Sequence, residues 1–256
     1  MSLELQLPDD VVDYLGSCGR YFIFEFKEDY IEISSIYGGK PLLVSIDADN
    51  LENYHNPSYG VYALINVNMV YRGIIIGRGH EFYSDGRRVG YEIPIDMAVI
   101  LDSSPISPQD DGFKGSYVEV SDVKEFIQIY DEIKESEYVA LKWSYGSWLS
   151  PYSLIISISS YEPILKRFKA DRVFIEQTSV YRAKDVKYLL KPVKYFSKRV
   201  ISSIVIYEYY GTLGLQYIFE DFGEVRVAIE PAGGDEIINK FDVVKEYIEK
   251  EFNIIG

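Results

Sequence analysis

The stretch FEFKEDYIEISSIYGGKPLLVSID, residues 24–47, predicts consecutive β-strands joined by short turns. The runs at residues 20–27, 30–35 and 42–47 are rich in β-branched and aromatic residues, which favour strands. KED at residues 27–29 and GGKP at residues 38–41 separate these runs with residues that are typical of turns. The N-terminal part of the chain is therefore expected to be built mainly from strands.

The same kind of pattern continues along most of the chain. Further strands are predicted at residues 138–145, 154–159, 172–177, 201–209, 213–220 and 224–229. Helices are predicted at residues 8–16, 66–77, 121–135 and 184–198. Pro192 lies inside the last helix, where a proline removes a backbone donor and should kink or split it.

The order of these elements repeats along the chain. Corresponding helices are offset by about 115 residues, which indicates an internal duplication. Residues 95–113 lie between the two copies, with an apolar front and a centre that is rich in Pro, Ser and Asp. The predicted organisation is therefore a first domain at residues 1–94, a connector at 95–113, a second domain at 114–232 and a helical extension at 233–256.

The helical extension has its own apolar stripe. Ile237, Phe241, Val244 and Ile248 recur at helical spacing between residues 235 and 252, so they must be buried against something. One interpretation is packing on its own domain. The other is that the stripe covers a partner-binding pocket or a neighbouring subunit.

A basic helix face stands out against the charge of the chain. The 256 residues include 40 acidic and 26 basic side chains, a formal net charge of -14. Lysines spaced three and four residues apart nevertheless share one helix face, namely Lys184, Lys187, Lys191, Lys194 and Lys198. This concentration suggests contact with a polyanion, and the alternative is an ordinary solvated face.

The sequence offers little for catalysis. It contains no phosphate-binding loop of the GxxxxGK[ST] type and no GxSxG motif. Cys18 is the only cysteine, and His55 and His80 lack the spacing of metal ligands. We therefore expect no enzyme activity, no metal and no cofactor. No apolar run is long enough to span a membrane and no secretory signal is evident, so a cytoplasmic location is expected.

Taken together, the order of these features resembles the DNA sliding clamps of archaea and eukaryotes, the proliferating-cell-nuclear-antigen family. Residues 24–47 look like the early hairpin of that family, and residues 116–143 look like the start of its second domain. Residues 181–231 look like its final helix and strand meander. Ile229-Glu230-Pro231 stands where the family has a short Leu-Ala-Pro tail. The resemblance covers about residues 3–232.

The resemblance implies an α+β fold of two tandem similar domains, with helices on one face and antiparallel sheets on the other. It further implies a nucleoid-associated ring that encircles double-stranded DNA without reading its sequence. Such a ring is a homo- or heterotrimer of clamp subunits, is opened by a clamp loader, and tethers polymerases, ligases or nucleases through their peptide motifs. The function implied is that of a processivity factor in DNA replication and repair.

The resemblance also assigns roles to particular residues. The DNA-facing set would comprise Lys184, Lys187, Lys191, Lys194, Lys198, Arg199, Arg72 and Arg78. The partner pocket would comprise Ile36, Leu43, Met97, Ile100, Leu101, Ala228, Ile229 and Pro231. The subunit interface would pair edge strands that carry Arg88, Tyr91, Ile93, Val173 and Ile175.

Two features of the sequence depart from the family pattern. Tyr37 and Lys40 occupy positions where the family often has an Asp and a His, and Glu230 replaces the tail alanine. The first and third predicted helices also add few cations to the basic face. Glu230 and the uneven basic face favour an alternative function, namely a clamp-fold interaction protein that does not encircle DNA and instead binds or blocks a partner. For residues 97–101 a buried strand is likewise an alternative to an exposed partner surface.

Overall fold

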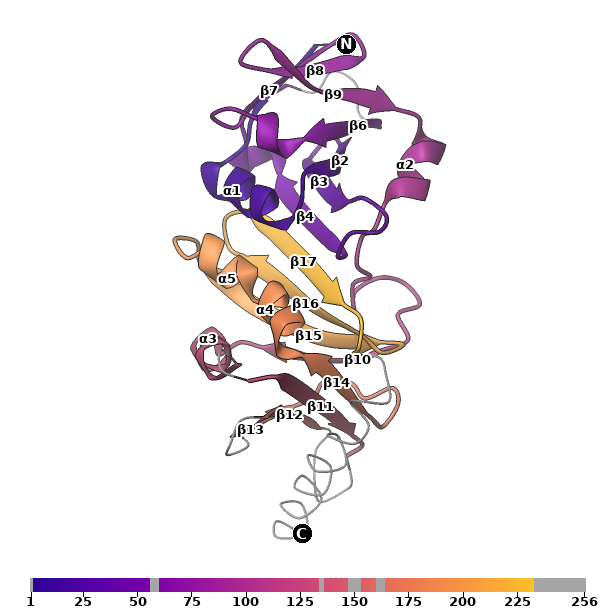
Figure 1. Cartoon of the computed structure of the whole chain (residues 1–256), viewed down its shortest axis with the longest axis vertical. Helices are drawn as coiled ribbons and strands as arrows, with labels where there is room; N and C mark the ends of the chain where they lie inside the picture. Colours follow the sequence, from indigo (N-terminus) through magenta and orange to yellow (C-terminus); the bar gives the residue numbers. More distant parts are fainter. Residues whose placement is uncertain (1, 56–59, 134–135, 147–152, 160–163, 233–256) are drawn as a thin grey trace. The chain divides into compact units, whose positions relative to one another are not determined.

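The computed structural model is a mixed α+β protein with a large antiparallel sheet, and it describes residues 2–55, 60–133, 136–146, 153–159 and 164–232 (Figure 1). The chain divides into two compact units. The first contains Met1–Pro105, Lys191–Ser202 and Gln216–Ala228, and the second contains Ile106–Leu190, Ser203–Leu215 and the segment that begins at Ile229. Each unit is therefore assembled from segments that are distant in sequence.

The first unit contains most of the strands. Its elements are β1 (Ser2–Gln6), α1 (Asp9–Cys18), β2 (Tyr21–Phe26), β3 (Tyr30–Ser35), β4 (Leu42–Asp47), β5 (Glu52–His55), β6 (Val61–Asn66), β7 (Ile74–Arg78), β8 (Glu81–Ser84), β9 (Arg87–Ile93), α2 (Ile95–Leu101), α5 (Lys191–Tyr195) and β17 (Gly223–Ile229). Neighbouring strands follow the order β17-β4-β3-β2-β6-β9-β8-β7-β1-β5. β17 thus comes from the end of the described chain to pair with β4.

The predicted meander of residues 24–47 is confirmed by β2, β3 and β4. These strands pair in sequence order, with Phe24 opposite Ile33 and Ile33 opposite Val44. All three of these side chains are fully buried, so one face of the meander forms core. The other face places Glu25 opposite Glu32, both partly exposed.

The predicted helix at residues 66–77 is wrong. The chain instead forms a short 3-10 turn, Val67–Met69, and then strand β7. Gly73 adopts a φ of +68°, and a Cβ there would lie 2.0 Å from the carbonyl oxygen of Leu7. The amide of Leu7 donates to the carbonyl of Gly73 at 2.8 Å, which starts the β1–β7 ladder. This close approach of two backbones, which only glycine permits, overrides the helical spacing of the apolar residues.

The second unit is built around a smaller sheet. Its elements are β10 (Ser116–Val120), α3 (Val123–Ile133), β11 (Tyr138–Ser144), β12 (Ser153–Ser159), β13 (Ile164–Lys169), β14 (Gln177–Arg182) and α4 (Ala183–Leu189). Four of these strands form a sheet in the order β13-β12-β11-β14, and β10 pairs with β15 (Ile201–Tyr209). β15 and β16 (Thr212–Phe219) contribute residues to both units.

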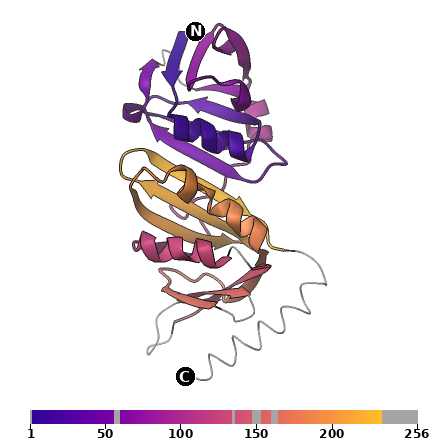
Figure 2. The same cartoon turned by 60° about the vertical axis from the view of Figure 1, so that its left-hand side comes forward.

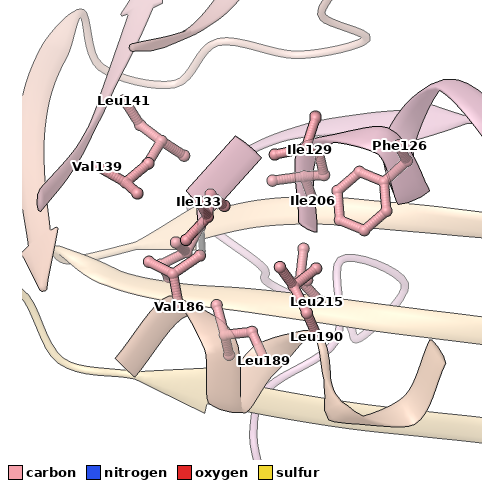
Figure 3. Close-up of a pocket in the computed structure, with 11 residues that line it drawn as sticks. Phe126, Ile129, Ile133, Val139, Leu141, Val186, Leu189, Leu190, Ile206 and Leu215 are labelled. Atoms are coloured by element: carbon pink, nitrogen blue, oxygen red, sulfur yellow. The ribbon is translucent and has the colours of Figure 1, made fainter. Parts of the chain in front are cut away.

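Helices α3 and α4 lie next to each other and cover the apolar core of the second unit (Figure 2). Their apolar side chains converge with those of the neighbouring strands on a cavity of about 30 Å³ (Figure 3). Phe126, Ile129 and Ile133 of α3 and Leu189 of α4 are almost fully buried there. The amphipathic pattern at residues 121–135 is therefore confirmed as a core-facing helix.

The predicted strand at residues 172–177 is wrong. Arg172 forms only an isolated bridge with Tyr117, and the regular strand β14 starts at Gln177. Side-chain contacts hold this segment, because the Arg172 guanidinium donates to the carbonyl of Phe113 and the Phe174 amide donates to Ser116 Oγ at 2.9 Å. These local bonds take the place of a ladder.

The predicted break in the lysine helix is confirmed. α4 ends at Leu189, and α5 runs from Lys191 to Tyr195 with Pro192 buried inside it. The division between the two units also falls between Leu190 and Lys191. The proline therefore marks the point at which the chain leaves one unit and enters the other.

Within the first unit, α1 packs against α5 and the segment that follows it. Tyr14 of α1 contacts Phe196, with the ring centroids 5.2 Å apart. Arg199 forms a two-pronged ion pair with Asp10, with Nε 2.6 Å from Oδ2 and Nη2 2.9 Å from Oδ1. The same guanidinium lies 4.3 Å from the centre of the Phe222 ring. These contacts join α1 to a segment almost 190 residues away in sequence.

We predict that Arg199→Ala lowers the free energy of unfolding by about 2 kcal/mol, because it removes two charge-assisted hydrogen bonds from a partly buried carboxylate. Denaturant unfolding followed by circular dichroism measures this change. Lys198→Ala is the matched control, because Lys198 is exposed and the change should stay within about 0.5 kcal/mol. Equal effects of the two substitutions would contradict the prediction.

A buried carboxyl group lies in the core of the second unit. Glu208 of β15 accepts a hydrogen bond from Trp143 Nε1 at 2.7 Å and another from Ser179 Oγ. Burial raises the pKa of Glu208 above its ordinary value of 4.5, although the hydrogen bonds from Ser179 and Trp143 oppose this shift. The folded state therefore holds a proton more tightly at this carboxyl than the unfolded state does.

The pKa of Glu208 is higher in the folded state than in the unfolded state. The free energy of unfolding therefore falls as pH rises through and above pH 4.5, because the unfolded state releases this proton more readily. We predict that Glu208→Gln flattens the fall in unfolding free energy between pH 4.5 and neutral pH. Denaturant unfolding at several pH values measures this slope. Glu119→Gln, at an exposed position of β10, is the control and should leave the slope unchanged. If the unfolding free energy of Glu208→Gln fell with pH as steeply as that of the wild type, Glu208 would not be the source of the pH dependence.

Candidate protein-docking site at α2

Helix α2 presents large apolar side chains to solvent. It follows β9 directly, and the Ala98 amide donates to the carbonyl of Pro94 to close its first turn (Figure 1). On this seven-residue helix, Ile95, Val99 and Ile100 are 62%, 70% and 67% exposed. Residues 97–101 are therefore a helix and not a buried strand. A cluster of exposed apolar residues of this kind is typical of an interaction surface.

The opposite side of α2 is anchored to the first unit. Ala98 is buried together with Ile23 and Ile93, and Leu101 packs against this group. After the helix, Asp102 bridges to Ile36, and the Ser103 amide donates to the carbonyl of Ser35 at 2.8 Å. Anchoring on both the helix and the following residues keeps the large side chains of α2 directed outward.

A cavity of about 100 Å³ lies between α2 and the sheet. It is lined by Ile23, Glu25, Glu32, Ser34, Leu43, Tyr62, Ala98, Val99, Asp102 and Ser104. The lining residues of β2, β3, β4 and β6 stand on one face of the sheet, because their strand registers place them side by side. The cavity is thus half apolar and half polar.

The polar half of the cavity is a row of cross-strand neighbours. Tyr62 is opposite Glu25, and Glu25 is opposite Glu32. Two carboxylates directly opposite each other repel, and Lys27 offsets this repulsion, with Nζ 3.3 Å from Glu25 and 2.8 Å from Glu32. Tyr62 Oη donates to Glu25 at 2.8 Å.

The pKa values of this row reflect the same contacts. Burial, together with the hydrogen bond to Glu25 and its charge, raises the pKa of Tyr62 to about 12. Partial burial lowers the pKa of Lys27, but the hydrogen bond and charge of Glu32 outweigh it and raise the pKa above its ordinary value of 10.5. Lys27 therefore stays charged, and Tyr62 stays a neutral hydrogen-bond donor.

The cavity remains acidic overall. Asp102 adds a third carboxylate to its lining and accepts a hydrogen bond from Ser104 Oγ at 2.7 Å. The three carboxylates and the ammonium of Lys27 together carry a formal charge of about -2, counted over the described residues. The site can thus accept an apolar group on α2 and a cation beneath it.

The partner pocket expected from the sequence is only partly assembled. Ile36 and Leu101 pack in the anchoring group, Leu43 lines the cavity, and Met97 and Ile100 are exposed on α2. The remaining members are Ala228, which is buried in the first unit, and Ile229 and Pro231, which belong to the second unit. Sequence reasoning missed Glu25, Glu32 and Tyr62, although the alternation of Ile23 and Glu25 places both on one face of β2.

The expected DNA-facing residues have different environments. Lys184, Lys194 and Lys198 are exposed, whereas Lys187 and Lys191 are partly buried. Lys191 Nζ donates to the carbonyl of Ser17 at 2.7 Å, and Arg199 is held by Asp10. The stripe is also divided, since Lys184 and Lys187 belong to the second unit and the other three lysines belong to the first.

Arg72 and Arg78 do not lie on a helix. Arg72 occupies a turn with a φ of +53°, where its guanidinium lies 5.0 Å from the centre of the Tyr71 ring. Arg78 ends strand β7. The helix predicted at residues 66–77 is thus replaced by a turn and a strand, and the DNA-facing role of the two arginines stays a prediction.

The edge strand expected at β9 is also wrong. β9 pairs with β6 on one side, where Leu64 is opposite Tyr91, and with β8 on the other, where Glu81 is opposite Tyr91. Ile93 pairs with Tyr62, and Arg88 pairs with Tyr83. In the second proposed edge, Val173 is buried and Ile175 is exposed, and neither belongs to a regular strand.

Two further findings concern the residues that the structure describes. Among them, no group of three or more His, Cys, Asp or Glu side chains could hold a metal ion. None of their helices is long and apolar enough to cross a membrane. The predicted helix at residues 235–252 lies outside the described residues.

Comparison with known proteins adds no relative. No family model matches the chain, and no curated protein matches it either. The resemblance to sliding clamps therefore depends on the order of elements along the chain.

We predict that Lys27→Met lowers the free energy of unfolding by about 1 kcal/mol at neutral pH, because Glu25 and Glu32 then face each other without the ammonium between them. The pKa of Lys27 is raised in the folded state, so its stabilisation is complete below pH 10.5 and is lost as pH rises through the raised pKa. The difference between wild type and variant should thus stay constant from about pH 7 to about pH 9.

Denaturant unfolding at these pH values measures the effect of Lys27→Met. Lys198→Met is the control, because it removes an exposed lysine in the same unit. A Lys27→Met variant as stable as the wild type would show that the two carboxylates do not need the lysine.

Proposed function

We propose that the protein is a clamp-fold interaction protein that binds partners of DNA replication or repair through α2, without closing a ring through β9. The observation that carries this proposal is the anchored helix α2 with Ile95, Val99 and Ile100 exposed. A rigid helix that exposes three large aliphatic side chains provides a binding surface at little cost in conformational entropy.

The link to replication rests on the order of the elements. A strand, a helix and a run of strands open the chain, and the same order starts again at β10 and α3. This order and the segment between the repeats resemble the sliding clamps. An analogy between folds supports a broad biological process, here DNA replication or repair, and does not identify a specific reaction.

The absence of ring closure through β9 is inferred from strand pairing. In the clamp family, subunits join by pairing edge strands, and residues 88–94 are the expected edge. β9 lies between β6 and β8: its first residues pair with β8, its last residues pair with β6, and Gly90 and Tyr91 pair with both. A neighbouring strand that paired along the whole of β9 would therefore have to displace β6 or β8.

The charge of α1 favours a protein that does not encircle DNA. Asp9 and Asp13 are exposed on α1, which packs beside α5. These acids lower the net charge of the helix pair, which makes the pair less attractive to a polyanion.

We predict that α2-binding peptides can be selected from a displayed library of random 16-residue peptides with the full chain as bait. Val99→Asp combined with Ile100→Asp should weaken such peptides at least tenfold, because it removes two apolar contacts and introduces charge. Val200→Asp is the control, since Val200 is an exposed valine of the same unit. Peptides that bind the Val99→Asp/Ile100→Asp variant as tightly as they bind the wild type and Val200→Asp would refute docking at α2.

The second candidate function is that of a sliding clamp subunit that encircles DNA, and the observation in its favour is the exposure of Lys184, Lys194 and Lys198. In this case the partners would be double-stranded DNA, other clamp subunits, a clamp loader and the peptide motifs of replication enzymes. Each lysine that contacts a phosphate would steepen the salt dependence of binding.

Stimulation of a DNA polymerase on primed circular DNA separates the two functions. We predict no stimulation that depends on these lysines. Stimulation that disappears when Lys184, Lys194 and Lys198 are all changed to Glu, and that survives the change of Lys169 to Glu, would support the clamp function instead. Lys169 is an exposed lysine of β13 and serves as the matched control.

A further inference from the structure

We propose that the partner segment docked on α2 inserts an arginine or lysine side chain into the acidic cavity beneath the helix. This inference rests on the proposed docking function and names the chemistry of the partner. The occupant is a short peptide segment in which a basic residue lies next to a large apolar residue.

The size of the cavity permits a side-chain head group. Its volume of about 100 Å³ is several times the roughly 10–15 Å³ that holds one water molecule. The strand floor and α2 enclose it from two sides, so an entering group is partly shielded from solvent. Shielding of this kind strengthens the attraction between opposite charges.

The charge of the cavity selects a cation. Glu25, Glu32 and Asp102 line it, and within the part of the chain that the structure describes Lys27 is the one ammonium in contact with the two glutamates. A carboxylate has about four lone-pair sites, and the contacts of Glu25 with Tyr62 and Lys27 occupy about two of them. Acceptor capacity therefore remains for an ammonium or guanidinium group.

The apolar part of the cavity suits the stem of a basic side chain. The apolar lining is formed by Ile23 and Leu43 of the sheet and by Ala98 and Val99 of α2. Arginine and lysine place their methylene groups on such surfaces while their charged ends reach polar groups. A metal ion is a poorer occupant, because among the described residues no cluster of three ligands is present.

The position of the cavity links it to the exposed face of α2. Val99 belongs to both, because it lines the cavity and is 70% exposed. A segment that covers Val99 and Ile100 therefore brings its neighbouring residue to the entrance. The apolar contact with α2 buries surface area and so contributes affinity. The cation in the cavity makes the site specific for segments that carry a basic residue.

The test uses the full chain and the peptides selected on α2. We expect these peptides to carry an arginine or lysine at a fixed spacing from an apolar residue. Dissociation constants are measured for the wild type and for Glu32→Gln and Asp102→Asn, which remove cavity charges at different positions. Each variant should weaken binding about tenfold, and added salt should weaken wild-type binding more than variant binding.

Glu28→Gln is the matched control, because Glu28 is exposed and lies outside the cavity lining. Replacement of the basic residue of the peptide by Gln should weaken binding to the wild type but not to Glu32→Gln. This non-additivity identifies a direct contact. Asp102→Asn keeps the result interpretable if Glu32→Gln is poorly folded, because Asp102 is on the exposed rim.

The outcomes separate the two proposals. Peptides that lose affinity with Val99→Asp and Ile100→Asp but lack a basic residue, or that bind Glu32→Gln and Asp102→Asn unchanged, would overturn this inference alone. Peptides that ignore the α2 substitutions would refute the docking function itself. A chain that selects no peptide but doubles its mass, with the doubling lost on the α2 substitutions, would overturn the inference by making a second copy the occupant.

Discussion

The pairing of β9 on both sides is the constraint on which the first unit depends. β6 and β8 hold this strand from either side, and Pro94 ends it so that α2 starts at the next residue. The ladder therefore fixes where α2 leaves the sheet and which side of the helix faces the core. The same pairing occupies many of the backbone groups with which an edge strand would join another chain.

The acidic cavity shows how a polar site is built on the surface of a sheet. Glu25 and Glu32 are neighbours in the ladder, a placement that is unfavourable unless a cation lies between them. Lys27 provides that cation, and Tyr62 adds a neutral donor at the end of the row. The arrangement places two carboxylates in the lining of a cavity that is half apolar and half polar, where they can attract a positive group.

Sequence patterns predict correctly those strands and helix breaks that depend on interactions between residues close in sequence. The strands β2, β3 and β4 are rich in β-branched and aromatic residues, and they are separated by KED at residues 27–29 and GGKP at residues 38–41. The break at Pro192 follows from the chemistry of one residue. The prediction of a helix at residues 66–77 is wrong because Gly73 lies against the backbone of Leu7. This contact joins residues that are distant in sequence, so no local pattern contains it.

The candidate site was predicted only in part for the same reason. Met97, Ile100 and Leu101 were identified from their apolar character, but whether they are exposed depends on Ala98 packing against Ile23. The cavity combines residues from four strands and a helix, so its acidic character emerges only once the strand registers are known.

The role of β9 also could not be read from its own sequence. An edge strand and an interior strand have similar patterns, and the partner strand β6 lies more than twenty residues earlier in the chain. The pairing is the observation on which we base the proposal of a protein that binds partners without closing a ring through β9.

The most direct test of this account is the mass of the full chain in solution at micromolar concentration, measured by analytical ultracentrifugation. A protein whose β9 is satisfied within its own unit should sediment as a monomer of 29.5 kDa. A stable species of three times that mass would contradict the account, because it would show that the chain closes a ring despite the pairing of β9.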